Sequence, residues 1–299
     1  GNAGIGLETT KVLAAAGATV IVAARDIEKA KRNLRGINNV ELEAMDLMEP
    51  GSIHVFADRF LSSGRPLHLL VNNAGIMWVP LRRNSLGIES QLATNYLSQF
   101  ILTAKLFPAL RAAAGARVIN VSSQGHQFAS FNFDDPNFIR REYDTLQGYG
   151  QSKTASNLFS LELDNRVKSA NIRAYSLHPG QIGDTELARE APLELFKQLG
   201  YVDEQGIILP EIAASLKTLS QGAATTIWCA TSPSLTDIGG VYCEDVDIAV
   251  LADEPAGSSL TQGVRPYSLD ETNAKMLWSW SEKITGLQFP VGPHTSRYV

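Results

Sequence analysis

The stretch GNAGIGLETTKVLAAAGATVIVAAR, residues 1–25, begins as a glycine-rich turn, continues as an Ala-rich apolar helix and ends in the apolar run Ala18 to Ala24. Glycine-rich turns that feed a helix bind phosphate, because the free amides and the helix dipole point at it. The apolar run has the length and composition of a strand buried on both faces. The stretch therefore predicts one β-turn-α-β unit of a dinucleotide-binding α/β sheet. Such a turn needs a strand before it, so we expect that strand, and room for a targeting or anchoring segment, upstream of Gly1.

Composition and charge argue against several classes of protein. The 299 residues carry a net charge of -5 with mixed signs, and they contain no basic stripe for nucleic acid. No apolar run reaches the ~18 residues that span a bilayer, and no signal peptide opens the given chain. Cys229 and Cys243 lack the spacing of metal ligands or of a disulfide framework and are expected to be core residues. We expect a single-domain cytoplasmic protein without a metal, either a monomer or a homodimer.

The residue at the tip of the Ala18 to Ala24 strand predicts the kind of dinucleotide. It lies about 20 residues beyond the turn, where dinucleotide folds read the adenosine ribose. Here Arg25 follows a small neutral residue, and a guanidinium can hold a phosphate bidentately. NADP(H) is therefore preferred over NAD(H). Two alternatives stay open: Arg25 as a solvated strand end, and Asp26 as a partner of the ribose.

A second carboxylate, Asp46, follows the expected strand Val40 to Ala44. At that strand end it could accept a hydrogen bond from an adenine amino group. It could equally cap the helix expected from Pro50 onwards.

Two further strand ends carry polar side chains. The strand Leu67 to Val71 ends in Asn72-Asn73-Ala74-Gly75, and the strand Arg117 to Val121 ends in Ser122-Ser123. Asparagines there can join neighbouring strands through their amides, and Ala74-Gly75 lets the backbone approach a ligand. A hydroxyl at the carboxyl end of a strand in an open α/β sheet points into the ligand crevice, although both serines could simply cap a turn.

Tyr149-Gly150-Gln151-Ser152-Lys153 supplies a candidate proton donor. On a helix, Tyr149 and Lys153 stand at i and i+4 on the same face. An ammonium beside a phenol favours the phenolate, so we expect Lys153 to lower the pKa of Tyr149 towards the operating pH. The spacing alone is common by chance and needs the other motifs.

Together these motifs resemble the short-chain dehydrogenase/reductase family, in the right order and over essentially the whole chain. The long loop from Phe131 to Gly148 resembles the retinol-dehydrogenase-like branch, to which WW-domain-containing oxidoreductases also belong. The opening pattern of the family, Thr-Gly-x-x-x-Gly-x-Gly, is present only as its end, Gly4 and Gly6. The resemblance implies a single-domain Rossmann-type doubly wound parallel sheet flanked by helices, with a small substrate lid at about residues 186–215.

The resemblance also implies the chemistry, an oxidoreductase that interconverts a small-molecule carbonyl and an alcohol with NADP(H). Tyr149 would transfer the proton, Lys153 would lower its pKa and bind the nicotinamide ribose, Ser123 would orient the substrate oxygen, and Asn95 would hold a water on the proton path. The implied cofactor contacts are Gly1, Asn2, Gly4, Ile5, Gly6, Arg25, Asp46, Leu47, Asn73, Ala74, Gly75, Tyr149, Lys153, Pro179, Gly180, Ile182 and Thr185. Thr185 is displaced by one residue from the spacing usual in the family, and His178 is expected to be structural.

Two other functions remain open at this point. The chain could bind the dinucleotide as a sensor or scaffold without turnover, or it could reduce a double bond as protochlorophyllide reductases do. The four residues Tyr149, Lys153, Ser123 and Asn95 favour catalysis over sensing, and the lack of a cysteine near the Tyr/Lys helix disfavours the pigment chemistry. The lid and the loop of residues 131–148 would select the substrate, and neither contains a readable code.

Overall fold

The computed structural model describes residues 1–183, 185–252 and 260–291. Its strands are β1 (Val20–Ala24), β2 (Val40–Ala44), β3 (Leu69–Asn72), β4 (Ala116–Val121), β5 (Ile172–His178), β6 (Val241–Glu244) and β7 (Asp247–Ile248). Its α-helices are α1 (Gly4–Ala15), α2 (Ile27–Asn33), α3 (Pro50–Ser62), α4 (Ser90–Leu92), α5 (Ser98–Ala112), α6 (Thr145–Val167), α7 (Leu193–Gln198), α8 (Pro210–Ser215), α9 (Leu219–Thr231) and α10 (Glu271–Thr285). Short 3-10 helices span η2 (Gln124–Phe128), η3 (Lys168–Ala170), η4 (Pro233–Leu235) and η5 (Pro266–Leu269).

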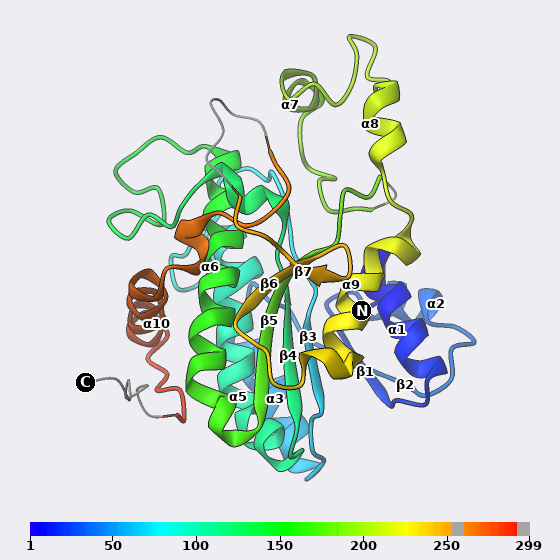
Figure 1. The fold of residues 1–299 in the computed structure, drawn as a ribbon, viewed down its shortest axis with the longest axis vertical. Helices are drawn as coiled ribbons and strands as arrows, with labels where there is room; N and C mark the ends of the chain where they lie inside the picture. Colours follow the sequence, from blue (N-terminus) through cyan, green and yellow to red (C-terminus); the bar gives the residue numbers. More distant parts are fainter. Residues whose placement is uncertain (184, 253–259, 292–299) are drawn as a thin grey trace.

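The strands form two sheets whose partners run parallel except at one edge. One sheet has the order β3-β4-β5-β6-β7, in which only β7 is antiparallel, and the other pairs β1 with β2. Alternating strands and helices produce this arrangement, because parallel neighbours need a crossover connection. The predicted α/β fold with a parallel sheet between helices is confirmed (Figure 1). The strand expected upstream of Gly1 stays a prediction; β1 and β3 both line the cleft described below.

Helices cover both faces of the larger sheet (Figure 1). The face covered by α5, α6 and α10 holds an aromatic core that includes Phe100, Phe159 and Trp278. On the other face α9 packs beside α1, and a smaller cluster there contains Cys229 and Cys243, which are buried and free as expected. No helix in the described part of the chain is long and apolar enough to cross a membrane.

A row of polar side chains crosses the sheet beneath α6. The register pairs Asn72 with Asn120 and Asn120 with Ser176. Asn72 Nδ2 donates to Asn120 Oδ1 at 2.8 Å, and Asn120 Nδ2 donates to Ser160 Oγ of α6 at 2.8 Å. The expectation that an asparagine joins neighbouring strands is therefore confirmed for Asn72.

The helix expected from Ile88 to Ala113 is interrupted. A π-helical turn, Ala93–Leu97, separates α4 from α5 and carries Asn95 at its centre. Turns of this kind are often found at functional sites.

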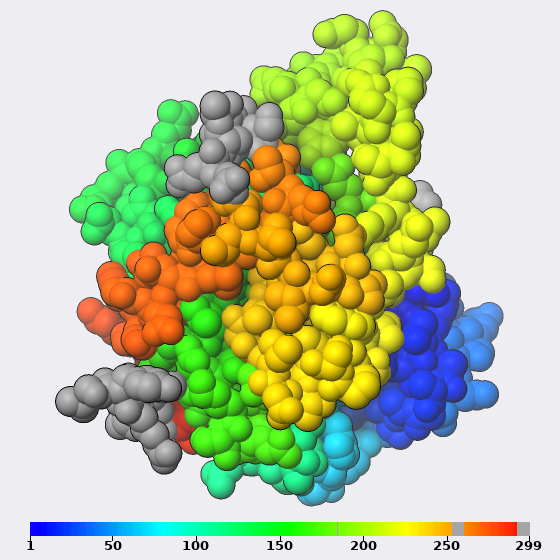
Figure 2. All heavy atoms as spheres, in the orientation of Figure 1, coloured from blue at the N-terminus to red at the C-terminus, as the bar shows by residue number. Residues whose placement is uncertain are grey.

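The segment of residues 188–216 projects from the body of the protein. It contains α7 and α8 and rises beyond the end of the sheet at which β5 finishes (Figure 1). Figure 2 shows it as a separate lobe on the surface of the molecule. Its role as a lid stays a prediction, and its position matches one, because ligands of open α/β sheets bind outside the carboxyl ends of the strands.

Candidate active site

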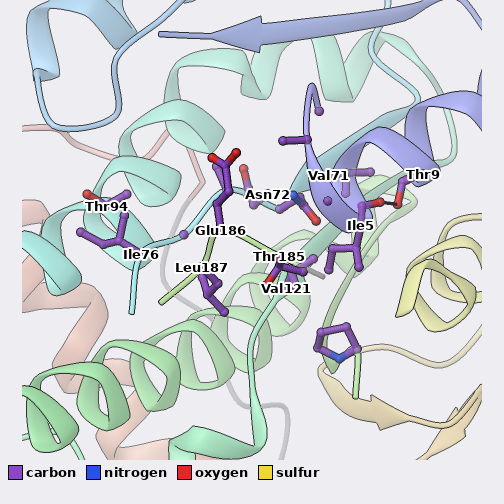
Figure 3. A pocket seen from close by; sticks show the side chains of 18 of the residues that line it. Ile5, Thr9, Val71, Asn72, Ile76, Thr94, Val121, Thr185, Glu186 and Leu187 are labelled. Carbon is purple, nitrogen blue, oxygen red and sulfur yellow. Dashed lines mark hydrogen bonds between the residues drawn. The ribbon is translucent and has the colours of Figure 1, made fainter. Parts of the chain in front are cut away.

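A large cleft lies at the carboxyl ends of the strands, with a volume of about 1960 Å³. Ligand pockets usually enclose about 300–1,000 Å³, and this cleft is larger because it also extends between β1 and β3. All the cofactor contacts expected from the sequence line it, and so does Ser123. Asn95 lies behind its wall. Figure 3 shows part of the lining, with Ile5 of α1 beside Thr185.

The start of α1 forms a cradle suited to phosphate. Gly4 has φ +51°, and Ala3, at the N-cap, makes no side-chain capping bond, so the first amides of the 12-residue helix are left without a partner from the helix or the cap. A Cβ on Gly6 would lie only 2.5 Å from Asn73 Nδ2. Asn73 Oδ1 is buried and has no hydrogen-bond partner among the described residues. Free amides and an orphaned acceptor beside glycine fit a dinucleotide.

Arg25 and Asp26, which follow β1, have different environments in the structure. Asp26 Oδ1 accepts from the Lys29 backbone N–H at 2.9 Å and caps α2, so this carboxylate is engaged in helix capping. Arg25 is exposed and makes no ion pair within the described ranges. This difference weakens the alternative in which Asp26 serves the ribose.

After β2, Asp46 does not cap the following helix. The N-cap of α3 is Glu49, so that alternative was wrong. Asp46 Oδ1 instead accepts from the Met48 backbone N–H at 2.9 Å, within a turn that leads into the cleft. Leu47 lines the cleft beside it.

Tyr149 and Lys153 lie on the same face of α6, and both are buried. Lys153 Nζ stands 5.6 Å from the centre of the Tyr149 ring and donates to the Val121 carbonyl at 2.9 Å. Burial lowers the pKa of Lys153 to about 7. Burial likewise raises the pKa of Tyr149 to about 12, although a hydrogen bond with Ser123 opposes the rise.

The expected lowering of the Tyr149 pKa by Lys153 is therefore wrong, since the pKa is raised. The physical reason is desolvation, which disfavours both the phenolate and the ammonium. The ammonium is also directed at a backbone carbonyl instead of the phenol. The sequence could not show this, because the depth of burial depends on distant segments.

Ser123 lies two residues beyond the end of β4 and is the N-cap residue of η2. Its Oγ accepts from the Gly125 backbone N–H at 3.0 Å, and the same side chain acts to lower the pKa of Tyr149. Ser122 points elsewhere, and its hydroxyl donates to the Lys153 carbonyl at 3.1 Å. The expected division between a site serine and a structural serine thus agrees with the geometry.

Two glycines that the sequence reasoning missed allow the Tyr149 ring to lie against η2. A Cβ on Gly125 would be 2.6 Å from the Tyr149 ring, and a Cβ on Gly150 would be 2.7 Å from the Ala129 amide nitrogen. Gly150 directly follows Tyr149 and Gly125 lies two residues after Ser123, and this closeness to motif residues is the signal that could have found them.

Both the oxygen and the nitrogen of the Asn95 side-chain amide form hydrogen bonds within the protein. Its Oδ1 accepts from the Ile76 N–H at 2.8 Å, and its Nδ2 donates to the Ile76 carbonyl at 2.9 Å and to Ser152 Oγ at 3.0 Å. These bonds fix the loop after Gly75 against α6. The expected role in holding a water stays a prediction.

The loop after β5 brings its expected contacts to the start of α1. Gly180 has φ +94°, and the Lys217 side chain lies against it. A Cβ on Gly4 would be 3.6 Å from the Thr185 methyl group, so Thr185 reaches the glycine turn in spite of its displaced spacing. Pro179 lines the cleft, and Ile182 packs with Ile5 around Gly222.

Two histidines beside the site act as structural acceptors. His178 Nδ1 accepts from the Gln124 N–H at 3.1 Å, and His126 Nε2 accepts from the Arg265 N–H at 3.1 Å. Burial lowers the pKa of His126 to about 4 and that of His178 to about 3. Both rings are therefore neutral at pH 7, and the expectation for His178 agrees with this environment.

An aromatic cluster walls the cleft under the projecting segment. The Trp78 ring lies 5.3 Å from that of Phe196 and 6.3 Å from that of Tyr201. The loop of residues 131–148 supports this wall through Tyr143, which donates to buried Glu89 and accepts from Gln91 Nε2. Gln91 Oε1 in turn accepts from the Trp78 N–H at 2.9 Å. The loop thus braces the site, which its sequence did not reveal.

Comparisons with known proteins agree with this site. The short chain dehydrogenase family matches residues 1–194. A probable oxidoreductase of Streptomyces lividans is 40% identical over 94% of this chain and 93% of its own, and retinol dehydrogenase 12 of Mus musculus is 32% identical over 96% and 85%. The crystal structure of an uncharacterised protein from Mycobacterium paratuberculosis, 31% identical, aligns with a TM-score of 0.71 over 97% of this chain and 92% of that one.

These similarities extend over nearly the whole length of the chain and of its relatives. The mouse protein also agrees with the retinol-dehydrogenase-like branch expected from the sequence. The chain belongs to the short-chain dehydrogenase/reductase family and is an oxidoreductase of that family.

Proposed function

We propose that the protein interconverts a carbonyl compound and an alcohol with NADP(H). The observation that carries the proposal is the convergence of Tyr149, Ser123 and Lys153 on one wall of the cleft that also contains the glycine turn. The family uses NAD(P)H, and the bound nicotinamide would supply the hydride. The chain's own residues then have to bind, orient and move one proton.

Tyr149 is the proton donor in the direction of reduction. With a pKa of about 12 it is a neutral phenol at pH 7, so its proton is available to the oxygen that becomes the alcohol. Its partner Ser123 orients that oxygen by a hydrogen bond. After transfer, the nearby Lys153 ammonium stabilises the phenolate. The phenolate in turn favours the charged form of Lys153, because an opposite charge then stands beside it.

The preference for NADP(H) rests on the tip of β1. Asp26 caps α2, and Arg25 is exposed at the edge of the cleft without an ion pair among the described residues. A guanidinium free to move there favours a phosphate over a ribose hydroxyl.

The substrate we favour is a bulky apolar carbonyl compound. Trp78, Phe196 and Tyr201 wall the cleft, and Leu193, Ile208 and Ile212 extend its apolar lining. The name of the mouse relative, a retinol dehydrogenase, agrees with an apolar substrate.

The test is Tyr149→Phe, assayed by NADPH consumption against a panel of small and lipophilic carbonyls. We expect turnover to fall by about 10²–10⁴-fold, the usual contribution of a general acid, with the NADPH Kd within about twofold of wild type. Near-normal turnover in the variant would overturn the assignment of Tyr149. Wild-type binding of NADPH without consumption across the panel would favour a sensor.

A further inference from the structure

The segment of residues 185–190, here called the strap, crosses the mouth of the cleft. Thr185 lies beside Gly4 at one end of the strap, and the Leu187 carbonyl accepts from the Met77 N–H at 3.2 Å in its middle. At the other end Glu190 forms an ion pair with Arg82 at 2.6 Å. The strap therefore connects the glycine turn to the base of the projecting segment.

A second ion pair ties the strap to the nucleotide half of the protein. Lys29 Nζ lies 2.7 Å from Glu186 Oε1 and 2.6 Å from Oε2, across 157 residues of sequence. Figure 3 shows Glu186 and Leu187 pointing in opposite directions from the strap. Hydrogen bonding from Lys29, with further attraction from the same ammonium, holds the pKa of Glu186 below its usual range.

Lys29 lies close enough to the end of β1 to contact a phosphate bound there. It lies in the first turn of α2, four residues after Arg25, which follows β1, and both line the cleft together with Asn2 and Ala24. Lys31, two residues further along α2, pairs instead with Glu28 and does not line the cleft. Of these two lysines, only Lys29 faces the ligand side.

A phosphate and the Glu186 carboxylate would compete for the same ammonium. A phosphate monoester carries about -1.5 to -2 charges and three acceptor oxygens, against one charge and two oxygens for a carboxylate. Glu186 is half exposed and can turn into solvent when it is displaced. A ribose with a free 2′-hydroxyl has no such charge and leaves the ion pair in place.

We propose that Lys29 and Arg25 together bind the 2′-phosphate of the cofactor, and that Glu186 occupies Lys29 until this phosphate displaces it. The inference rests on the proposed use of NADP(H). Displacement releases one end of the strap, so the phosphorylated cofactor selectively loosens the segment that covers the substrate.

The test uses titration calorimetry of the whole chain with adenosine 2′,5′-bisphosphate and with adenosine 5′-monophosphate, which differ only in the 2′-phosphate. For Lys29→Gln we expect the bisphosphate Kd to rise about tenfold, the scale of one charge-assisted hydrogen bond, while the monophosphate Kd stays within about twofold. For Glu186→Gln we expect the bisphosphate to bind about threefold more tightly, because its competitor is gone. Lys31→Gln and Glu28→Gln are the matched controls and should change neither Kd.

Equal changes for both nucleotides in Lys29→Gln, or no change for either, would overturn the proposal. So would weaker bisphosphate binding in Glu186→Gln. Wild-type binding of the monophosphate alone, with turnover supported by NADH, would also overturn it and would leave the carbonyl chemistry intact. The failure of the chemistry is seen separately, in the Tyr149→Phe assay.

Discussion

The face of α6 that carries Tyr149 and Lys153 and the strap over the cleft are held by opposite kinds of interaction. Tyr149 and Lys153 are 2% and 3% exposed, and short bonds to backbone atoms and glycine contacts fix their surroundings. The strap is held mainly by ion pairs whose side chains are exposed, with Glu186 at 54% and Arg82 at 57%. Exposed ion pairs stabilise a fold only weakly because water and salt screen the charges, so the strap can release while Tyr149 and Lys153 stay in place.

The largest effect is expected from a substitution next to the buried Tyr149 ring, at a residue with no proposed role in the reaction. Gly125→Ala places a methyl group 2.6 Å from the Tyr149 ring, so the ring must shift. We expect kcat to fall about 10²-fold, because small misplacements of a reacting group have effects of this size. The nucleotide Kd measured by calorimetry should hardly change. Gly51→Ala is the control, since nothing lies within 4 Å of its added methyl group; a kcat for Gly125→Ala equal to that of this control contradicts the rigid placement of Tyr149.

The next effect is the pH dependence of stability that burial of Lys153 should produce. Its pKa is about 7 in the folded chain against 10.5 for a free lysine, so the unfolded chain binds more protons between these values. The free energy of unfolding therefore rises with pH from about 7 upwards. Below pH 7 the buried ammonium destabilises the folded chain most. His126 and His178, with pKa values of about 4 and about 3 in the folded chain against 6.5 for a free histidine, add a separate rise in stability that ends just above pH 6.5.

Lys153→Met should remove this dependence. We expect the Tm of the cofactor-free protein to rise between pH 6.5 and 9 more steeply in wild type than in the variant. The comparison needs thermal melts of both proteins in matched buffers. Parallel Tm profiles would show that Lys153 is not the desolvated group the structure describes.

A smaller effect is expected in the projecting segment. Phe196→Ala removes the edge-to-face contact with Trp78 at 5.3 Å, and such aromatic pairs contribute about 0.5–1.5 kcal/mol beyond their buried area. We expect the KM for a bulky apolar carbonyl to rise about tenfold with little change in kcat. Ile207→Ala, on the same segment but 65% exposed, is the control. A decrease in kcat alone would show that Phe196 affects the chemical step and not the binding of the substrate.

The sequence predicted those parts of the fold and site that depend on local pattern. The glycine turn, the strand ends at Asn73 and Ser123, and the Tyr149 to Lys153 spacing each follow from a few adjacent residues, and their sites meet because parallel strands end at one edge. The parallel sheet between helices followed from the alternation of strands and helices.

What the sequence did not predict depends on contacts between distant segments. The pKa values of Tyr149 and Lys153 reflect burial, whereas spacing suggested the opposite direction for Tyr149. The pair of Lys29 and Glu186 joins residues far apart in the chain, and the support of Trp78 by the loop of residues 131–148 requires Glu89 and Gln91. No periodicity or motif signals such contacts.

The row of polar side chains beneath α6 has a consequence for how the chain reaches its native pairing. A slip of β4 by one residue against β3 would turn Asn120 to the opposite face of the sheet, among Val121, Tyr175 and Leu177, and would leave its amide unpaired. The same slip would carry Ser123 about 3.3 Å along the strand and away from Tyr149. The asparagines therefore select against out-of-register sheets, and a chain that satisfies them has already aligned Tyr149 with Ser123.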